Sequence, residues 1–268
     1  MMHIEELEDQ LVKELASGKG QASLFLEIED RIIEFNSTEV FRSASLIKLP
    51  ILFEALRQLE EGILQPDRLL SVRQEDKVGD TGVLQAMNTQ QITIHDLLTL
   101  MIIVSDNSAT NLVIDLIGMA PINSTISKIG MKNTILKRRM LDFKAAQAGN
   151  DNFTTSADIV LCLKEAIEGQ WLKEQSRDRF TALLLQQQFK EKLPAYMDQS
   201  LMEIGNKTGE LTGIEHDCAV ITYGDKRAYA AVLIDGLEDN ETGKSIIRQV
   251  GKQINSYISG ISTGNPNY

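Results

Sequence analysis

The sequence predicts an α/β fold with two lobes, in which both ends of the chain build one lobe around a β-sheet and a helical lobe lies between them. Both ends combine strand patterns with an amphipathic helix, whereas the middle has helical spacing almost throughout. Apolar residues make up 43% of the 268 positions, enough for a sizeable core. We expect residues 1–43 and 188–268 to form the first lobe and residues 44–187 the second.

The N-terminal end predicts a helix followed by a β-hairpin. Apolar residues recur at helical spacing over residues 2–16, and the glycines of 17–20 end that helix. Residues 22–29 and 31–36 have the composition of strands, with a tight turn at Asp30 between them.

The middle of the chain predicts helices and one long loop. Helical periodicity recurs over residues 45–61, 95–104, 108–117, 121–129, 156–168 and 178–187. Residues 131–155 show little periodicity, and a loop of this length inside a compact domain is usually functional. Strand character returns over 201–207, 217–223 and 228–234, before an amphipathic helix over 241–258.

The charge balance excludes several classes of partner. There are 38 acidic and 27 basic residues, a net charge of −11, and the densest basic run is 137–139. Nonspecific binding to nucleic acid or to anionic membranes needs clustered lysine and arginine. The densest apolar run, 97–104, is much shorter than the ~20 residues of a membrane helix. We therefore expect a monomer that acts on a small molecule.

Cysteine and histidine give no sign of a disulfide or a metal site. Cys162 and Cys218 are far apart and are interpreted as small core residues. The histidines, His3, His95 and His216, are scattered, so no metal is predicted. The chain does not begin with a basic segment followed by an apolar one, which favours the cytoplasm, or export with a leader outside this sequence.

The first chemical motif is Ser45-Leu46-Ile47-Lys48 at a predicted helix start. Residues three apart share one helix face, so the Lys48 amine can reach the Ser45 hydroxyl. A serine becomes a good nucleophile when a neighbouring base takes its proton, and lysine serves if its pKa is lowered. A solvated helix start carries the same pattern, so this motif is weak alone.

The second motif is Ser105-Asp106-Asn107, in the break between two predicted helices. These residue types are also the preferred helix N-caps, so capping is the simpler interpretation. In the functional interpretation, Ser105 relays a proton to a leaving group and the Asn107 amide binds a substrate carbonyl.

The third motif is Lys207-Thr208-Gly209, at the predicted end of a strand. A strand that leads into a turn explains it without function. In the functional interpretation, Lys207 supplies positive charge beside Ser105 and Lys48, and Thr208 offers a hydroxyl to a substrate carboxylate. Gly209 lets the substrate approach the strand edge.

Together, in this order and at these spacings, the three motifs resemble those of class A β-lactamases and penicillin-binding proteins. The stretches Ser45-Leu-Ile-Lys-Leu-Pro and Val104-Ser-Asp-Asn-Ser-Ala-Thr-Asn111 look typical of β-lactamase-related serine hydrolases, and the resemblance covers roughly residues 6–258. It implies the β-lactamase/transpeptidase-like fold, with a mainly antiparallel sheet, the active site in the cleft between the lobes, and no metal or organic cofactor.

The resemblance also implies roles for individual residues. Ser45 is the acylated nucleophile, Lys48 its general base, Ser105 the relay to the leaving nitrogen, and Lys207 part of that relay. The oxyanion hole consists of the backbone N–H groups of Ser45 and Glu210.

Three further residues correspond to substrate contacts. Asn107 contacts the substrate amide and Thr208 the substrate carboxylate. Where many class A enzymes carry an arginine for that carboxylate, this chain has His216, which would need to be protonated. A histidine with a purely structural role is the alternative.

The sharpest departure from the family lies in the long loop. Counted back from Thr154-Thr155, Arg138 matches the family arginine, Met140 falls on the deacylating glutamate and Lys144 on the family asparagine. A thioether cannot act as a base. Deacylation therefore lacks its usual base.

Two outcomes stay open at this point. The acyl-enzyme is long-lived, as in penicillin-binding proteins without this glutamate, or Asp142, the one acid in residues 131–150, activates the water instead. We expect a β-lactamase-like hydrolase with slow deacylation. The alternatives are a D-alanyl-D-alanine carboxypeptidase, a small-substrate esterase, and a non-enzymatic sensor of β-lactam or peptidoglycan ligands.

Overall fold

A five-stranded antiparallel sheet joins the two ends of the chain, as predicted. The computed structural model describes residues 2–260, and the order of strands in its large sheet is β2-β1-β9-β8-β7. These strands are β1 (Gln21–Ile28), β2 (Arg31–Phe35), β7 (Glu203–Leu211), β8 (Ile214–Tyr223) and β9 (Lys226–Asp235). β7 is therefore an outer strand, and its far edge is open to contact with other elements.

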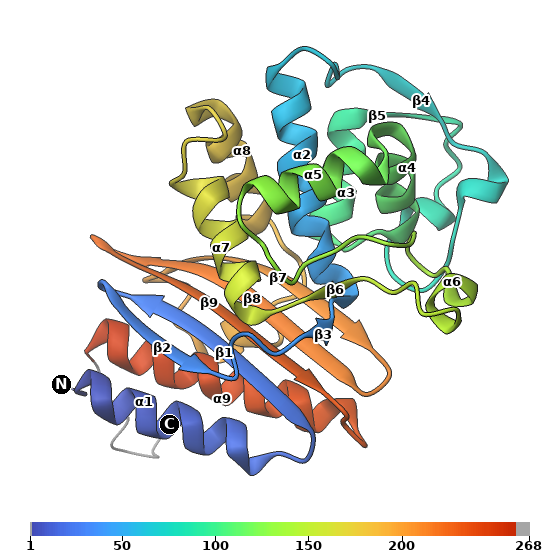
Figure 1. The fold of residues 1–268 in the computed structure, drawn as a ribbon. Helices are drawn as coiled ribbons and strands as arrows, with labels where there is room; N and C mark the ends of the chain where they lie inside the picture. Colours follow the sequence, from blue (N-terminus) through green and yellow to red (C-terminus); the bar gives the residue numbers. More distant parts are fainter. Residues whose placement is uncertain (1, 261–268) are drawn as a thin grey trace.

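The two terminal helices, α1 (Ile4–Ser17) and α9 (Asn240–Ser259), cover one face of this sheet (Figure 1). Side chains alternate between the faces of a strand. In β9, Ala230 and Val232 accordingly pack with the terminal helices, while Ala231 and Leu233 belong to the core of the helical region.

The helical region packs against the opposite face (Figure 1). Its helices are α2 (Lys48–Glu60), α3 (Ile94–Ile103), α4 (Asn107–Ile117), α5 (Met119–Lys128), α7 (Ser156–Ile167) and α8 (Glu174–Leu185). α2 lies at its centre and buries even Glu54, whose carboxylate accepts a 2.6 Å hydrogen bond from Thr125 of α5. These helices all fall within the predicted segment 44–187.

Several short elements were not predicted from the sequence. They are the strand pairs β3 (Phe41–Arg42) with β6 (Phe153–Thr154) and β4 (Leu69–Ser71) with β5 (Gln91–Thr93), the helix α6 (Phe143–Gln147), and the 3₁₀ helices η1 (Ala44–Ile47), η2 (Gln74–Asp76), η3 (Leu84–Ala86) and η4 (Leu193–Tyr196). Elements of two to five residues are too short to show a hydrophobic period.

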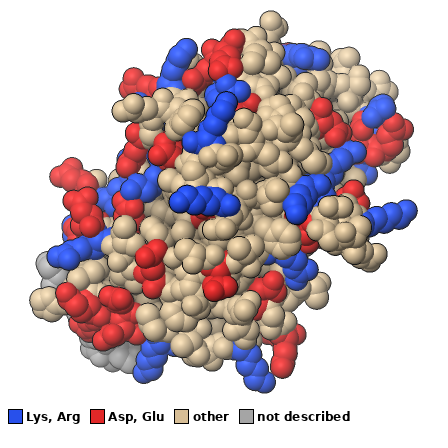
Figure 2. All heavy atoms as spheres, viewed as in Figure 1, with Lys and Arg blue, Asp and Glu red and all other residues tan. Residues whose placement is uncertain are grey.

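Both cysteines are free and fully buried, and burial raises the pKa of each thiol. Within residues 2–260, no helix is long and apolar enough to cross a bilayer. Acidic and basic side chains are interspersed over the face seen in Figure 2.

Helix α9 approaches η4 closely at Gly251. A Cβ atom at that position would lie 2.1 Å from the Leu193 carbonyl oxygen, a distance that no side chain tolerates. Glycine therefore allows the C-terminal helix to pack on the segment that precedes β7.

We expect Gly251→Ala to lower the free energy of unfolding by about 1–3 kcal/mol, because the added methyl group overpacks this contact. In an exposed helix the same change stabilises. Urea unfolding measures the effect, with Lys252→Ala, on the exposed side of the same helix, as the control. A stability gain in Gly251→Ala would contradict this packing.

Candidate active site

Ser45 lies in η1, immediately before α2, and its side chain is half-buried. Ala44, directly before it, has φ +45°, a left-handed conformation that is unfavourable for alanine. Strain of this kind persists only where the surrounding structure enforces it, and it clusters at functional sites. The backbone at Ser45 is therefore held in a defined geometry.

Lys48 is fully buried, one turn beyond Ser45. Its Nζ atom donates to the Ser105 carbonyl at 2.7 Å, to the Ser105 hydroxyl at 3.0 Å and to Asn107 Oδ1 at 2.9 Å. Burial, and then the charge of Lys207, lower the pKa of Lys48 well below its usual value. A lower pKa makes the neutral amine, which a general base needs, easier to form.

Lys207 reaches the same hydroxyl from the sheet. Its buried Nζ donates to Ser105 Oγ at 3.0 Å and to the Thr208 carbonyl at 2.7 Å, and burial lowers its pKa to about 7. The Ser105 hydroxyl therefore lies between two buried lysine amines, from α2 and from β7. The structure brings together Lys48, Ser105, Asn107 and Lys207.

The capping interpretation of the second motif applies to Asp106. Asp106 is the N-cap of α4: its Oδ1 accepts from Ala109 N–H at 2.9 Å, and its Oδ2 accepts from the N–H groups of Val83 and Leu84 at 2.7 Å each. This carboxylate fixes the preceding loop to the start of α4. The flanking residues Ser105 and Asn107 are then free to bond Lys48.

The third motif lies inside a strand, which corrects the prediction that the strand ends at Lys207. β7 continues to Leu211. Glycine at 209 permits this, because a Cβ there would lie 3.3 Å from both Ala44 Cβ and His216 Cβ. The edge strand can therefore lie against the turn that carries Ser45. Thr208 is nearly buried and stands opposite Asp217 in β8.

The long loop is anchored to α4 at Met140. Asn111 Oδ1 accepts from the Met140 N–H at 2.7 Å, and Asn111 Nδ2 donates to the Met140 carbonyl at 3.1 Å. Asn111 lies one turn beyond Asn107 on the same helix. Met140 is buried, whereas the exposed Asp142 is the N-cap of α6 and accepts from Ala145 N–H at 3.0 Å.

His216 is fully buried, and both of its ring nitrogens have backbone partners. Nε2 lies 2.9 Å from the Arg42 carbonyl, and Nδ1 accepts from Ile234 N–H at 3.2 Å. Burial lowers its pKa to about 4, so the ring is neutral at neutral pH. This geometry gives the predicted contact with a substrate carboxylate no support, and the ring instead connects β8 to β3.

Three residues near these motifs were missed by the sequence reasoning. Asp80, at φ +72°, lies 3.4 Å from Asn107 Nδ2 and raises the pKa of Lys48. Asn111 was part of a quoted stretch, but no role was assigned to it. Lys192 lies on the face of the sheet that the terminal helices cover, and no local sequence pattern indicates a role for it.

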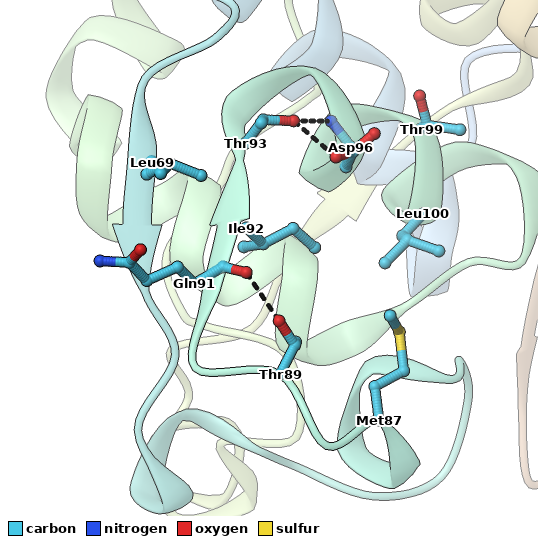
Figure 3. A pocket seen from close by; sticks show the side chains of 9 residues that line it. All are labelled: Leu69, Met87, Thr89, Gln91, Ile92, Thr93, Asp96, Thr99 and Leu100. Carbon is cyan, nitrogen blue, oxygen red and sulfur yellow. Dashed lines mark hydrogen bonds between the residues drawn. The ribbon is translucent and has the colours of Figure 1, made fainter.

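A pocket of about 360 Å³ lies elsewhere in the helical region (Figure 3). It is lined from β4, β5 and α3, with Leu100 and Ile92 on its walls, and contains no residue of the three motifs. It is therefore separate from the candidate active site.

A serine at a helix start and a second serine whose hydroxyl is bonded to two buried lysines, in a fold of helices and an antiparallel sheet, are typical of the penicillin-recognising serine enzymes. The chain belongs to the β-lactamase enzyme family, whose model matches residues 6–258. β-Lactamases CARB-3 and PSE-4 of Pseudomonas aeruginosa are each 24% identical to it over 157 residues, 58% of this chain and 54% of theirs. It thus spans about half the length of these curated relatives.

Solved structures support the same assignment and show the β-lactamase fold. A β-lactamase from Sphaerobacter thermophilus superposes with a TM-score of 0.89 at 27% identity, over 95% of this chain and 98% of that one. PBP-A superposes with a TM-score of 0.87 at 25% identity, over 96% and 97%. A PBP-A variant is described as an acyl-enzyme complex with penicillin G.

We expect Lys207→Met to raise the free energy of unfolding at pH 7, because a buried amine is replaced by an apolar side chain. Below pH 7 this lysine is charged in both the folded and the unfolded chain, and the folded state bears the full free-energy cost of burying the charge. Above pH 7 the folded chain loses the proton while the unfolded chain keeps it. The wild type therefore gains about 1.4 kcal/mol per pH unit, and the advantage of the variant shrinks.

Urea unfolding between pH 7 and 9 measures this difference, with the exposed Lys252→Met as the control. A stability advantage of Lys207→Met over the wild type that does not depend on pH would show that Lys207 has an ordinary pKa.

Proposed function

We propose that this chain is a serine hydrolase that β-lactams acylate at Ser45 and that deacylates slowly. The observation that carries the proposal is the Ser105 hydroxyl bonded at 3.0 Å to both Lys48 and Lys207. Two buried lysines cost folding free energy, and a hydroxyl shared between them is suited to moving a proton.

In the acylation step, neutral Lys48 takes the proton of Ser45, whose oxygen attacks the β-lactam carbonyl carbon. The proton then passes from Lys48 through Ser105 to the lactam nitrogen as the C–N bond breaks, and Ser45 is left as an ester. Asn107 binds the substrate amide, while Lys207 and Thr208 bind the carboxylate. The N–H groups of Ser45 and Glu210 stabilise the oxyanion.

In the deacylation step, a water must lose a proton as it attacks the ester. Met140 occupies the position of the usual base, and its backbone is bonded to Asn111 beside the site. These bonds support the register that assigns Met140 to that position. The carboxylate of Asp142 caps α6 and is exposed, which favours a long-lived acyl-enzyme over water activation by Asp142.

A D-alanyl-D-alanine carboxypeptidase is the second candidate, favoured by the similarity to PBP-A. The two activities share the acylation chemistry and differ in substrate. Release of D-alanine from a peptide ending in D-alanyl-D-alanine distinguishes them, and consumption of small esters alone would indicate the esterase alternative.

We expect benzylpenicillin to form a covalent adduct that persists for many minutes and is absent in Ser45→Ala. Intact-protein mass spectrometry over time measures it. An adduct that disappears while penicillin is consumed would contradict slow deacylation. If benzylpenicillin neither forms an adduct nor is consumed, the whole proposal is wrong. If the adduct persists and the protein also hydrolyses no ester or peptide, the result indicates the sensor alternative.

We expect Met140→Glu to accelerate loss of the adduct by at least tenfold, because a carboxylate then lies where the water must be deprotonated. Met140→Gln, with the same size and no basic group, is the matched control. Asp142→Asn should leave the deacylation rate unchanged. Equal rates in the Glu and Gln variants would show that the missing base does not limit deacylation.

A further inference from the structure

Lys192 lies directly before η4, fully buried on the side of the sheet that the terminal helices cover. Its Nζ atom donates to the carbonyl oxygens of Gly209 at 3.1 Å and of His216 at 3.3 Å, and pairs with the buried Glu215 carboxylate. Two carbonyl oxygens and a carboxylate, all of them acceptors, therefore surround this Nζ atom. The positive charge of Lys192 therefore rests against the Gly209 carbonyl.

The position of that carbonyl fixes the direction of the next N–H. Gly209 and His216 are direct partners in the β7–β8 ladder, and their carbonyls share one ammonium, so both point into the space between these strands. The peptide bonds of residues 2–260 are trans, and in a trans peptide the C=O and N–H groups point in opposite directions. The Glu210 N–H, in the same peptide unit, therefore points away from β8.

Away from β8 lies the open edge of the sheet, because β7 is its last strand. The turn of Ser45 packs on β7 at this point, on the face of the sheet toward the helical region: a Cβ on Gly209 would lie 3.3 Å from Ala44 Cβ and 3.4 Å from Leu46 Cγ. The Glu210 N–H thus points out from the sheet edge, one residue beyond the position where the segment that carries Ser45 packs on β7.

We propose that Lys192 is a positioning residue for oxyanion binding, acting through the Gly209–Glu210 peptide. The ammonium fixes the plane of this peptide and withdraws electron density from it, which makes the Glu210 N–H a stronger donor. In a buried environment, hydrogen bonds in series strengthen one another in this way. The proposal rests on the proposed function, because it requires an oxyanion at Ser45.

The charges around the ammonium are arranged to keep it in place. Asn240 Nδ2 donates to Glu215 at 2.8 Å, and Lys244 lies 3.7 Å from the same carboxylate. The Glu210 carboxylate lies 3.2 Å from Lys244 and 3.8 Å from Lys192. Glu210 is therefore held both through its side-chain carboxylate and through the carbonyl group of Gly209, which precedes it.

The test uses the double variant Lys192→Met/Glu215→Gln, which removes both charges of the pair and leaves neither one buried alone. Lys192→Arg retains the cation. Lys190→Met is the matched control, because Lys190 lies two residues away and its Nζ also donates to a carbonyl of β7, that of Ile204 at 3.1 Å, outside the third motif. Thermal unfolding confirms that each variant is folded.

Two readouts are taken with benzylpenicillin labelled with ¹³C at the lactam carbonyl. The first is the rate of Ser45 acylation, from intact mass. The second is the C=O stretching band of the acyl-enzyme ester, from difference infrared spectroscopy, which moves to higher wavenumber as hydrogen bonding to that oxygen weakens. We expect the double variant to acylate about tenfold more slowly and to show the higher band. We expect Lys192→Arg to restore both, and Lys190→Met to change neither.

Two results would overturn this inference and leave the proposed function standing. The first is a double variant with the acylation rate and the C=O band of the wild type. The second is a double variant that acylates slowly but has an unchanged band, which would indicate a purely structural role for Lys192. A wild-type protein that benzylpenicillin never acylates would overturn the proposed function, and the inference with it.

Discussion

The hydroxyl of Ser105 is shared by two lysines, and the rest of the site depends on that arrangement. Each amine is removed from water, and each lies 3.0 Å from the same oxygen. Burial penalises the charged form of both amines and lowers the pKa of each, and the charge of Lys207 lowers the pKa of Lys48 further. A site of this kind forms only where rigid elements hold the two lysines despite that cost.

The elements that hold them come from distant parts of the chain. Lys48 is on the central helix α2, Lys207 on the edge strand β7, and Ser105 directly before α4. Several strained residues lie where they meet: Ala44, Asp80, Ser105 and Leu141 have positive φ, as do three residues at the ends of β1 and β2. The Asp106 carboxylate, bonded to three backbone N–H groups, stabilises the junction. Stability supplied by the core and by such caps offsets this local strain.

The sequence predicted what local spacing can encode. Helix and strand periods located the large elements, and the i, i+3 relation of Ser45 and Lys48 placed both on one helix start. The contacts that it missed join elements that are distant in the sequence. Lys192 contacts Gly209 and His216 because η4 packs against the sheet beside β7. The His216 ring contacts β3 through the Arg42 carbonyl. No spacing along the chain reports such contacts, and a glycine that allows close approach, as at 209, resembles the end of a strand.

The two halves of the proposed reaction depend on the protein in different ways. The groups assigned to acylation are held by regular elements on both sides of β7: Lys48 and Ser105 on one side and, in our proposal, Lys192 on the other. The group assigned to deacylation depends on one side chain at position 140, in a loop whose backbone Asn111 already fixes through two hydrogen bonds. Because those bonds involve only the backbone of residue 140, they do not depend on which side chain stands there. In our proposal, a single substitution at position 140 therefore moves this chain between trapping an acyl group and releasing it, while the groups assigned to acylation remain where the sheet and helices hold them.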